Sequence, residues 1–195
     1  DRAYEQMATQ VNRMQSLADD LILLSRFEGA ESQGNGGLDG QQNYQPTNLF
    51  NLLSEIILEA QQLSGGRHSI QLDCSEALSL SVDPSGLRSA LGNLVFNAVR
   101  HNPQGAAIDI CVTELGDAVS ITIADDGVGL DPLEIPRLTE RFYRGDNSRN
   151  SDTGGSGLGL AIVKHAVTNC GGELQINSRL GQGAEFICSF PVGTD

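Results

Sequence analysis

Two asparagines in one stretch of sequence have a spacing that could serve chemistry. Asn93 and Asn97 are four residues apart within residues 91–102, with Arg100 or His101 three or four residues further on. Residues at these intervals share one face of a helix. Asparagine is a mediocre helix former, and its carboxamide oxygen suits a hard cation such as Mg²⁺ bound to phosphate oxygens. The pattern indicates a magnesium–phosphate site, although two solvated asparagines would give the same spacing.

An aspartate followed by alternating glycines forms the second candidate group. Asp125 ends an apolar alternating stretch, and Gly127 and Gly129 follow it. Glycines there would let a flat ligand approach the backbone closely. The carboxylate could accept a hydrogen bond from an exocyclic amine such as that of adenine. A tight turn without a ligand is the alternative interpretation.

A basic segment supplies the third group. Arg141, Arg144 and Arg149 lie within nine residues, and Phe142 and Tyr143 separate the first two. Arginine can bind phosphate oxygens through two parallel hydrogen bonds, and the aromatic residues would anchor a mobile loop. A surface loop with buried aromatics is the alternative.

A glycine-rich stretch, residues 154–160, opens a predicted helix. Backbone N–H groups and the helix dipole at such a start can face an anion. No lysine follows as in the common phosphate-binding loop, and no strand runs directly into it as a dinucleotide-binding fold requires. A glycine-rich lid over phosphates is the better interpretation.

Composition limits the partners. The 12 Lys and Arg against 25 Asp and Glu give a formal net charge of −13, which argues against nucleic acid and anionic membrane surfaces as partners. A nucleotide site must then be locally basic or use a metal. The four cysteines show no C-x-x-C pairing, so zinc and a disulfide framework are disfavoured and a reduced cytosolic setting fits best. No apolar run approaches the roughly 20 residues that span a bilayer.

The first predicted element is a helix from about Tyr4 to Glu28. Its apolar residues recur every three or four positions, as in a heptad seam: Met7, Val11, Met14, Leu17 or Ala18, Leu21 and Leu24. A lone helix cannot bury such a seam. Because the glycine- and amide-rich residues 29–45 read as a flexible linker, we expect a partner helix or a second chain, rather than the chain's own next domain.

The remaining elements should position the four groups. A helix is predicted to start at Pro46-Thr47-Asn48 and end at Gly65-Gly66, and another to open with Asp83 as N-cap and Pro84 at its first position. A third helix spans 158–170. Three strand pairs accompany them, near 69–74 and 78–82, 108–112 and 119–123, and 173–190 with a turn at 181–183. This order predicts an α/β fold, a two-layer sandwich of a mixed, largely antiparallel sheet and three helices.

In this order the four groups resemble the N, G1, F and G2 boxes of the histidine kinase family. That family belongs with the gyrase-like, chaperone-like and mismatch-repair ATPases, and the resemblance covers about residues 47–191. Residues 135–144 and 153–167 are especially similar to the sensor kinases of phosphate regulation. The resemblance implies the histidine kinase/gyrase-type ATP-binding fold in residues 46–195, preceded by one long heptad helix. Residues 1–28 would be the second helix of a dimerisation domain.

The resemblance also implies roles for individual residues. Asn97 would ligate Mg²⁺, and Asn93 would contact phosphate or the metal. Asp125 would bind the adenine amine, with Gly127 and Gly129 lining that pocket. His101 would stack near the adenine, and Arg100 and Arg144 would bind the phosphates. The lid would consist of Gly155, Ser156, Gly157, Leu158 and Gly159.

The implied activity is transfer of the γ-phosphoryl group of ATP–Mg²⁺ to a histidine on a dimerisation domain, and then to a response regulator. None of His68, His101 and His165 has the sequence context of such an acceptor. We therefore expect the acceptor, sensor and membrane segments to precede Asp1 in a longer homodimeric inner-membrane protein of which this is a cytoplasmic domain. This chain should bind ATP–Mg²⁺ without phosphorylating itself.

Three other functions fit the sequence less well. ATP hydrolases of the gyrase or chaperone type carry a glutamate base about four residues before the metal asparagine, where this chain has Asn93, a poor base. A serine kinase acting on an anti-sigma partner fits the initial heptad helix badly. A nucleotide-binding module without chemistry is disfavoured because usable residues fill all four boxes.

Overall fold

The computed structural model describes residues 44–145 and 156–192, together with seven positions between 7 and 25. The chain divides into two compact units, 1–41 and 42–195. In the first unit all seven described positions are helical and exposed: Met7, Val11, Met14, Ala18, Leu21, Ile22 and Ser25. They fall within the predicted heptad helix. The rest of that helix, and residues 29–43 of the predicted linker, lie outside the described residues.

The second unit is built on a five-stranded sheet with the order β2-β4-β5-β7-β6. Its strands are β2 (Ser69–Asp73), β4 (Ala107–Leu115), β5 (Ala118–Asp125), β6 (Glu173–Ser178) and β7 (Ala184–Pro191). Only β2 and β4 pair in parallel, and every other neighbouring pair is antiparallel. The predicted mixed, largely antiparallel sheet is confirmed.

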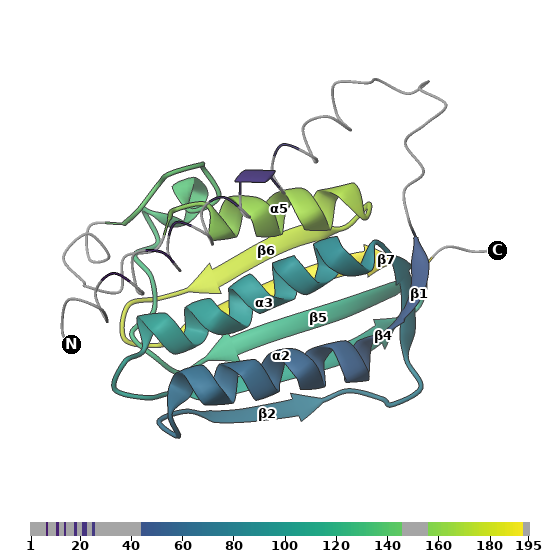
Figure 1. Cartoon of the computed structure of the whole chain (residues 1–195), viewed down its shortest axis with the longest axis horizontal. Coiled ribbons are helices and arrows are strands. Elements are labelled where there is room, and N and C mark those ends of the chain that lie inside the picture. The colour runs from purple at the N-terminus through teal and green to yellow at the C-terminus, as the bar shows by residue number, and fades with distance from the viewer. Residues whose placement is uncertain are drawn as a thin grey trace. The chain divides into compact units, whose positions relative to one another are not determined.

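Three helices cover one face of this sheet, as Figure 1 shows: α2 (Leu49–Ser64), α3 (Pro84–His101) and α5 (Gly159–Asn169). Alternate residues of β5 that face the helices, Val119, Ile121 and Ile123, are at most 1% exposed. Apolar helix residues such as Leu91 and Ile162 are fully buried as well. The period of two in the strand and of about 3.6 in the helices therefore places the core between the two layers.

The beginning of α3 confirms its predicted cap. The Asp83 side chain accepts hydrogen bonds from the backbone N–H groups of Ser85 at 3.2 Å and Gly86 at 3.0 Å. Pro84 occupies the first helical position, where its missing N–H is not needed. This cap fixes where the helix that carries both asparagines begins.

The predicted start of the first domain helix at Pro46 is wrong. Residues Gln45–Asn48 form a strand, β1, which pairs antiparallel with β3 (Ser79–Val82) in a separate two-stranded sheet. Helix α2 begins only at Leu49, capped by Asn48, whose side chain accepts from Asn51 N at 2.8 Å. The strand exists because of a partner that lies 31 to 37 positions further along the chain (79−48 and 82−45), which no local pattern could indicate. It also takes β3, one of the six predicted strands, out of the main sheet.

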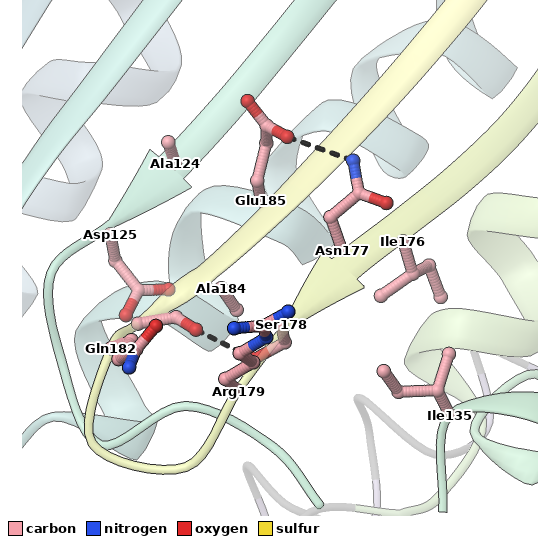
Figure 2. A pocket seen from close by; sticks show the side chains of 11 residues that line it. Ala124, Asp125, Ile135, Ile176, Asn177, Ser178, Arg179, Gln182, Ala184 and Glu185 are labelled. Atoms are coloured by element: carbon pink, nitrogen blue, oxygen red, sulfur yellow. Dashed lines mark hydrogen bonds between the residues drawn. The ribbon is translucent and has the colours of Figure 1, made fainter. Parts of the chain in front are cut away.

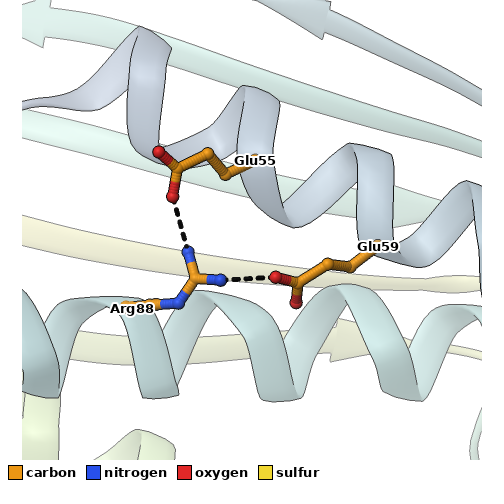
Figure 3. Close-up of polar contacts among 3 residues, drawn as sticks. All are labelled: Glu55, Glu59 and Arg88. Atoms are coloured by element: carbon orange, nitrogen blue, oxygen red, sulfur yellow. Dashed lines mark hydrogen bonds and ion pairs between the residues drawn. The ribbon is translucent and has the colours of Figure 1, made fainter.

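Helices α2 and α3 are joined on their outer side by one arginine and two glutamates (Figure 3). The Arg88 guanidinium donates to Glu55 at 3.0 Å and to Glu59 at 2.6 Å. The three side chains are 39%, 69% and 51% exposed. Solvent screens such pairs, so together they stabilise the domain by about 1 kcal/mol at most.

A further contact joins the start of the domain to the end of α5. The Tyr44 hydroxyl donates to the backbone carbonyl of Asn169, the last residue of α5, at 2.8 Å. The described part of the chain contains no helix that is both long and apolar enough to cross a bilayer.

Candidate nucleotide-binding site

Asp125 ends β5 and accepts several hydrogen bonds. Its Oδ1 accepts from Gly127 N at 3.0 Å and from Asn102 Nδ2 at 3.1 Å, and the backbone N–H of Ala184 also donates to the carboxylate. Burial, the largest effect, raises the pKa of Asp125, while these three donors act to lower it and nearby Asp126 raises it again. One more hydrogen-bond donor, such as an exocyclic amine, would further stabilise the charged form of this partly desolvated carboxylate.

Asn102 holds the turn after Asp125 and is a site residue that sequence reasoning missed. It follows α3 as its C-cap and is 4% exposed. Its Nδ2 donates to Ala98 O at 2.9 Å as well as to Asp125, and its Oδ1 accepts from Val128 N at 3.0 Å. The sequence offered one weak signal, an asparagine at a helix end, where it commonly satisfies backbone groups.

Close neighbours leave no room for a side chain at the two predicted glycines of this turn. A Cβ on Gly127 would overlap the Asn102 carboxamide, and one on Gly129 would overlap the carbonyl oxygen of Arg179. Gly129 also has a φ of +66°, which favours glycine. These residues therefore form a tight turn, which both interpretations of the sequence require, and the turn brings the backbone close to the carboxylate.

The C-terminal end of α3 brings two more predicted residues to Asp125. Desolvation is the largest cause that lowers the pKa of His101, even though part of its side chain is exposed. The charge of Arg100 lowers the pKa further, Asp125 raises it, and Arg144 adds a smaller lowering. Because all three charged groups act on His101, residues from three separate stretches of sequence lie near this ring: Arg100, Asp125 and Arg144.

The asparagine face of α3 lies against the start of α5. Asn93 Nδ2 donates to Ser89 O at 2.9 Å, which leaves its Oδ1 directed toward Gly159. A Cβ on Gly159 would lie 2.8 Å from Asn93 Oδ1 and 3.8 Å from Asn97 Nδ2. The absence of a side chain on Gly159 thus keeps space beside both carboxamides.

These donors fit a hard divalent cation. Carboxamide oxygens are ligands that Mg²⁺ accepts, usually together with waters and phosphate oxygens. The described residues contain no cluster of His, Cys, Asp and Glu suited to a metal ion. A cation held by two carboxamides would take its other ligands from water and phosphate oxygens.

Part of the predicted lid is visible. Gly155 lies outside the described residues. Ser156 Oγ accepts from Leu158 N at 3.1 Å, and Gly157, with a φ of +72°, accepts through its carbonyl from Phe142 N at 2.9 Å. The side chain of Leu158 is fully buried, so only its backbone could face a ligand. The basic segment and the glycine-rich stretch therefore meet directly.

The aromatic pair of the basic segment has divided roles. Arg137 stacks over the Tyr143 ring at 4.3 Å from its centroid, which anchors that residue. Phe142 is 65% exposed and has a φ of +61°. The alternative of a surface loop with buried aromatics is wrong, because Phe142 is exposed and Tyr143 is only half-buried. Arg149 lies outside the described residues.

A hollow of about 550 Å³ opens beside Asp125, between the ends of β5, β6 and β7 and Ile135 (Figure 2). Ile135 and Ile176 face each other across it, while Asn177 donates to Glu185 at 2.9 Å on another side. Of the predicted site residues only Asp125 lines it. Because both asparagines and His101 lie elsewhere, we place the candidate nucleotide site on the α3 side of Asp125.

Comparison with known proteins agrees with this arrangement of helices and sheet. The model of the Histidine kinase-, DNA gyrase B-, and HSP90-like ATPase family matches residues 82–194, more than half of the chain. The chain belongs to this family. The fold and the family expected from the four boxes are confirmed.

The similar proteins are sensor kinases. The chain is 44% identical over 190 residues to the phosphate regulon sensor protein PhoR of Pseudomonas aeruginosa, covering 97% of this chain and 41% of that protein. It is 34% identical over 200 residues to the sensor-like histidine kinase SenX3 of Mycobacterium bovis, covering 98% and 45%. The chain thus spans less than half the length of these relatives.

Solved structures share the fold. The mycobacterial sensor histidine kinase MprB superposes with a TM-score of 0.68 at 25% identity, over 75% of this chain and 97% of that one. Full-length ShkA in complex with AMPPNP gives a TM-score of 0.78 at 25% identity, over 100% of this chain and 39% of that one.

Proposed function

We propose that this chain is the ATP-binding catalytic part of a two-component sensor histidine kinase. In this role residues 46–195 bind ATP and residues 1–28 form the second helix of a dimerisation domain. The observation that carries the proposal is the convergence of all four predicted boxes at one end of the sheet. The charges of Asp125, Arg100 and Arg144 act on the pKa of His101, and Asn93 lies against Gly159.

Each residue of the candidate site has a role in nucleotide binding. Asp125 accepts a hydrogen bond from the adenine amine, beside the backbone of Gly127 and Gly129. Arg100 and Arg144 provide positive charge for the phosphates, as a chain with a net charge of −13 requires. The remaining residues stack on the base or close over the phosphates: His101, Gly155, Ser156, Gly157, Leu158 and Gly159.

We further propose that Asn97, assisted by Asn93, holds Mg²⁺. When bound, the cation would neutralise part of the charge on the phosphate oxygens. The orientation of Asn93 by Ser89 supports this assignment, because it directs a carboxamide oxygen toward the start of α5.

Phosphoryl transfer is favoured over hydrolysis at this site. The residue four positions before Asn97 is Asn93, whose amide cannot accept a proton from water as a carboxylate would. The nucleophile would then be a histidine of the dimerisation domain, and the phosphoryl group would pass on to a response regulator. The similarity to PhoR supports a role in phosphate signalling, in a homodimeric inner-membrane protein whose catalytic domain is cytoplasmic.

Titration calorimetry with ATP tests the metal assignment. Asn97→Ala should weaken ATP binding about tenfold or more in the presence of Mg²⁺ and little in its absence, since it removes a direct metal ligand. Asn51→Ala, at an exposed position of α2, is the matched control and should leave both affinities unchanged. Equal Mg²⁺-dependent binding in wild type and Asn97→Ala would show that the metal assignment is wrong.

Incubation with γ-labelled ATP tests the reaction. The chain alone should acquire no acid-labile phosphate, whereas a histidine-bearing dimerisation domain supplied separately should become labelled. Label on this chain would contradict the expectation that its three histidines are not acceptors. Rapid release of free phosphate without an acceptor would favour the hydrolase instead.

A further inference from the structure

His68, in the connection between α2 and β2, forms hydrogen bonds that lead toward the candidate site. Its Nε2 lies 2.8 Å from the carbonyl oxygen of Asn102, its Nδ1 lies 3.0 Å from Ser64 Oγ, and its backbone N–H donates to the same hydroxyl at 2.9 Å. Ser64 is 1% exposed. The ring therefore joins the end of α2 to the end of α3.

The partners determine which ring nitrogen carries the proton of the neutral imidazole. A backbone carbonyl can only accept, so Nε2 must donate to Asn102. Nδ1 then accepts from the Ser64 hydroxyl, whose oxygen in turn accepts the His68 backbone N–H. Every polar atom in this ring of contacts has a partner of the right kind, which holds the imidazole in one orientation.

Asn102 is the residue that this histidine holds, and it is also the residue that holds Asp125. Its carbonyl accepts from His68 and from Gly105 N at 2.8 Å. Its side chain meanwhile donates to Asp125 and accepts from Val128 N. The backbone of Asn102 has left the helical conformation, with φ −118° and ψ 63°, so hydrogen bonds rather than helix geometry fix its position.

We infer that His68 is a positioning residue for recognition of the nucleotide base: it fixes Asn102, and Asn102 orients Asp125 and the turn at 127–128. This inference rests on the proposed function of Asp125. His68 itself touches no nucleotide in this arrangement. A purely structural tie between α2 and α3 would stabilise the domain without affecting which base it prefers, and that difference makes the two roles separable.

The experiment measures base preference by titration calorimetry on the whole chain with Mg²⁺. The two probes are ATP and purine riboside 5′-triphosphate, which lacks the exocyclic amine. Variants are His68→Phe, which keeps a ring but loses both nitrogens, and Asp125→Ala. Arg88→Met is the matched control, because it removes the ion pairs between α2 and α3 without touching Asn102. Thermal melting shows that each variant is folded at the assay temperature.

Wild type and Arg88→Met should prefer ATP about tenfold, the worth of a hydrogen bond to a charged acceptor, and Asp125→Ala should show no preference. In His68→Phe the preference should fall to about threefold or less, with weaker ATP binding and nearly unchanged binding of the analogue. If this variant melts below the assay temperature, Ser64→Ala replaces it, because that change removes the hydroxyl that orients the ring. A reduced preference in Ser64→Ala would support the inference, and a preference retained in full would overturn it.

The failures of the two proposals look different. If wild type does not prefer ATP, or Asp125→Ala keeps the preference, the role of Asp125 is wrong and the role of His68 falls with it. If Asp125→Ala abolishes the preference and His68→Phe retains it in full, Asp125 keeps its role and the inference about His68 is overturned. A parallel loss for both nucleotides would identify His68 as a structural tie only.

Discussion

Asp125 and the groups around it show how a carboxylate can be held in one orientation and still accept a further hydrogen bond. Three donors, from Gly127, Asn102 and Ala184, fix its direction, yet burial keeps the pKa of Asp125 above its ordinary value. A partly desolvated carboxylate binds a further donor more strongly than one in water. Asp126 beside it serves the backbone instead, since its Oδ1 accepts from Ala107 N at 2.7 Å.

Gly127→Ala tests how closely this turn is packed. The added Cβ would overlap the Asn102 carboxamide, so we expect a loss of about 2 to 3 kcal/mol in the free energy of unfolding and at least tenfold weaker ATP binding. Gly116→Ala is the control: its Cβ meets nothing within 4 Å, and its φ of +63° alone should cost about 1 kcal/mol. Denaturant titration measures both. Equal losses would show that the Asn102 contact is not decisive.

His101 should give ATP binding a pH dependence. Its folded-state pKa lies below the ordinary 6.5, so the domain loses stability as pH falls from above 6.5 through the lowered value. Bound phosphates favour the charged ring, so ATP affinity should rise from pH 7.5 to 6 with proton uptake. Calorimetry in buffers of different ionisation enthalpy measures this uptake. His101→Gln should abolish it and should lose less stability than wild type on acidification; an unchanged uptake would contradict this account.

At the scale of elements, α5 connects the site to the start of the domain. It begins at Gly159, beside Asn93, and ends at Asn169, whose carbonyl accepts from Tyr44. Its first turn thus meets the candidate metal ligands, while its last turn is fixed to the segment that enters β1. The helix is 11 residues long, too short to be stable alone, so these end contacts and its buried face hold it in place.

Tyr44→Phe tests the contact at the far end of α5. It removes only the hydroxyl that donates to Asn169, so we expect a loss of about 1 kcal/mol and a melting temperature lower by about 2 to 4 °C. ATP affinity should change less than twofold, since the site end of α5 keeps its own contacts. Calorimetric melting and ATP titration check both values. An unaltered melting temperature would mean that solvent replaces this hydrogen bond without loss.

At the scale of the whole molecule, the two units differ in how they bury apolar surface. Residues 42–195 enclose a core between three helices and a sheet. In the first unit, described seam residues remain exposed: Met7 by 68%, Val11 by 59%, Met14 by 68% and Leu21 by 49%. A heptad seam of this kind becomes stable by packing against another helix.

Removing residues 1–41 tests this division. The chain 1–195 should associate with rising concentration in sedimentation experiments, because its seam can pair with that of a second copy, whereas residues 42–195 should stay monomeric. The shortened chain should still bind ATP within about twofold of the full chain, since every described site residue remains. Association of residues 42–195 alone would place the contact outside the seam, and loss of ATP binding would show that the first unit supports the site.

Local patterns in the sequence determined most of the elements. Alternation predicted β4 and β5, the turn at 181–183 predicted the hairpin of β6 and β7, and the Asp83-Pro84 pair predicted the start of α3, because caps, turns and periodicity act within a few residues. The order of four short boxes indicated the family and fold. The candidate site residues also came from these boxes, and their nucleotide contacts remain predictions: Asn93, Asn97, His101, Asp125 and Arg144.

Only the tertiary structure decided the features that depend on distant partners. Strand β1 exists through its pairing with β3, and local helix signals at Pro46-Thr47-Asn48 could not reveal it. Asn102 and His68 gained their roles from hydrogen bonds to Asp125, Val128 and Ser64, which meet only when α2, α3 and β5 pack together. Local propensity acts along the chain, but burial and hydrogen bonding depend on neighbours in space. The sequence therefore indicated the candidate site residues, and only the fold revealed the residues that hold them in position.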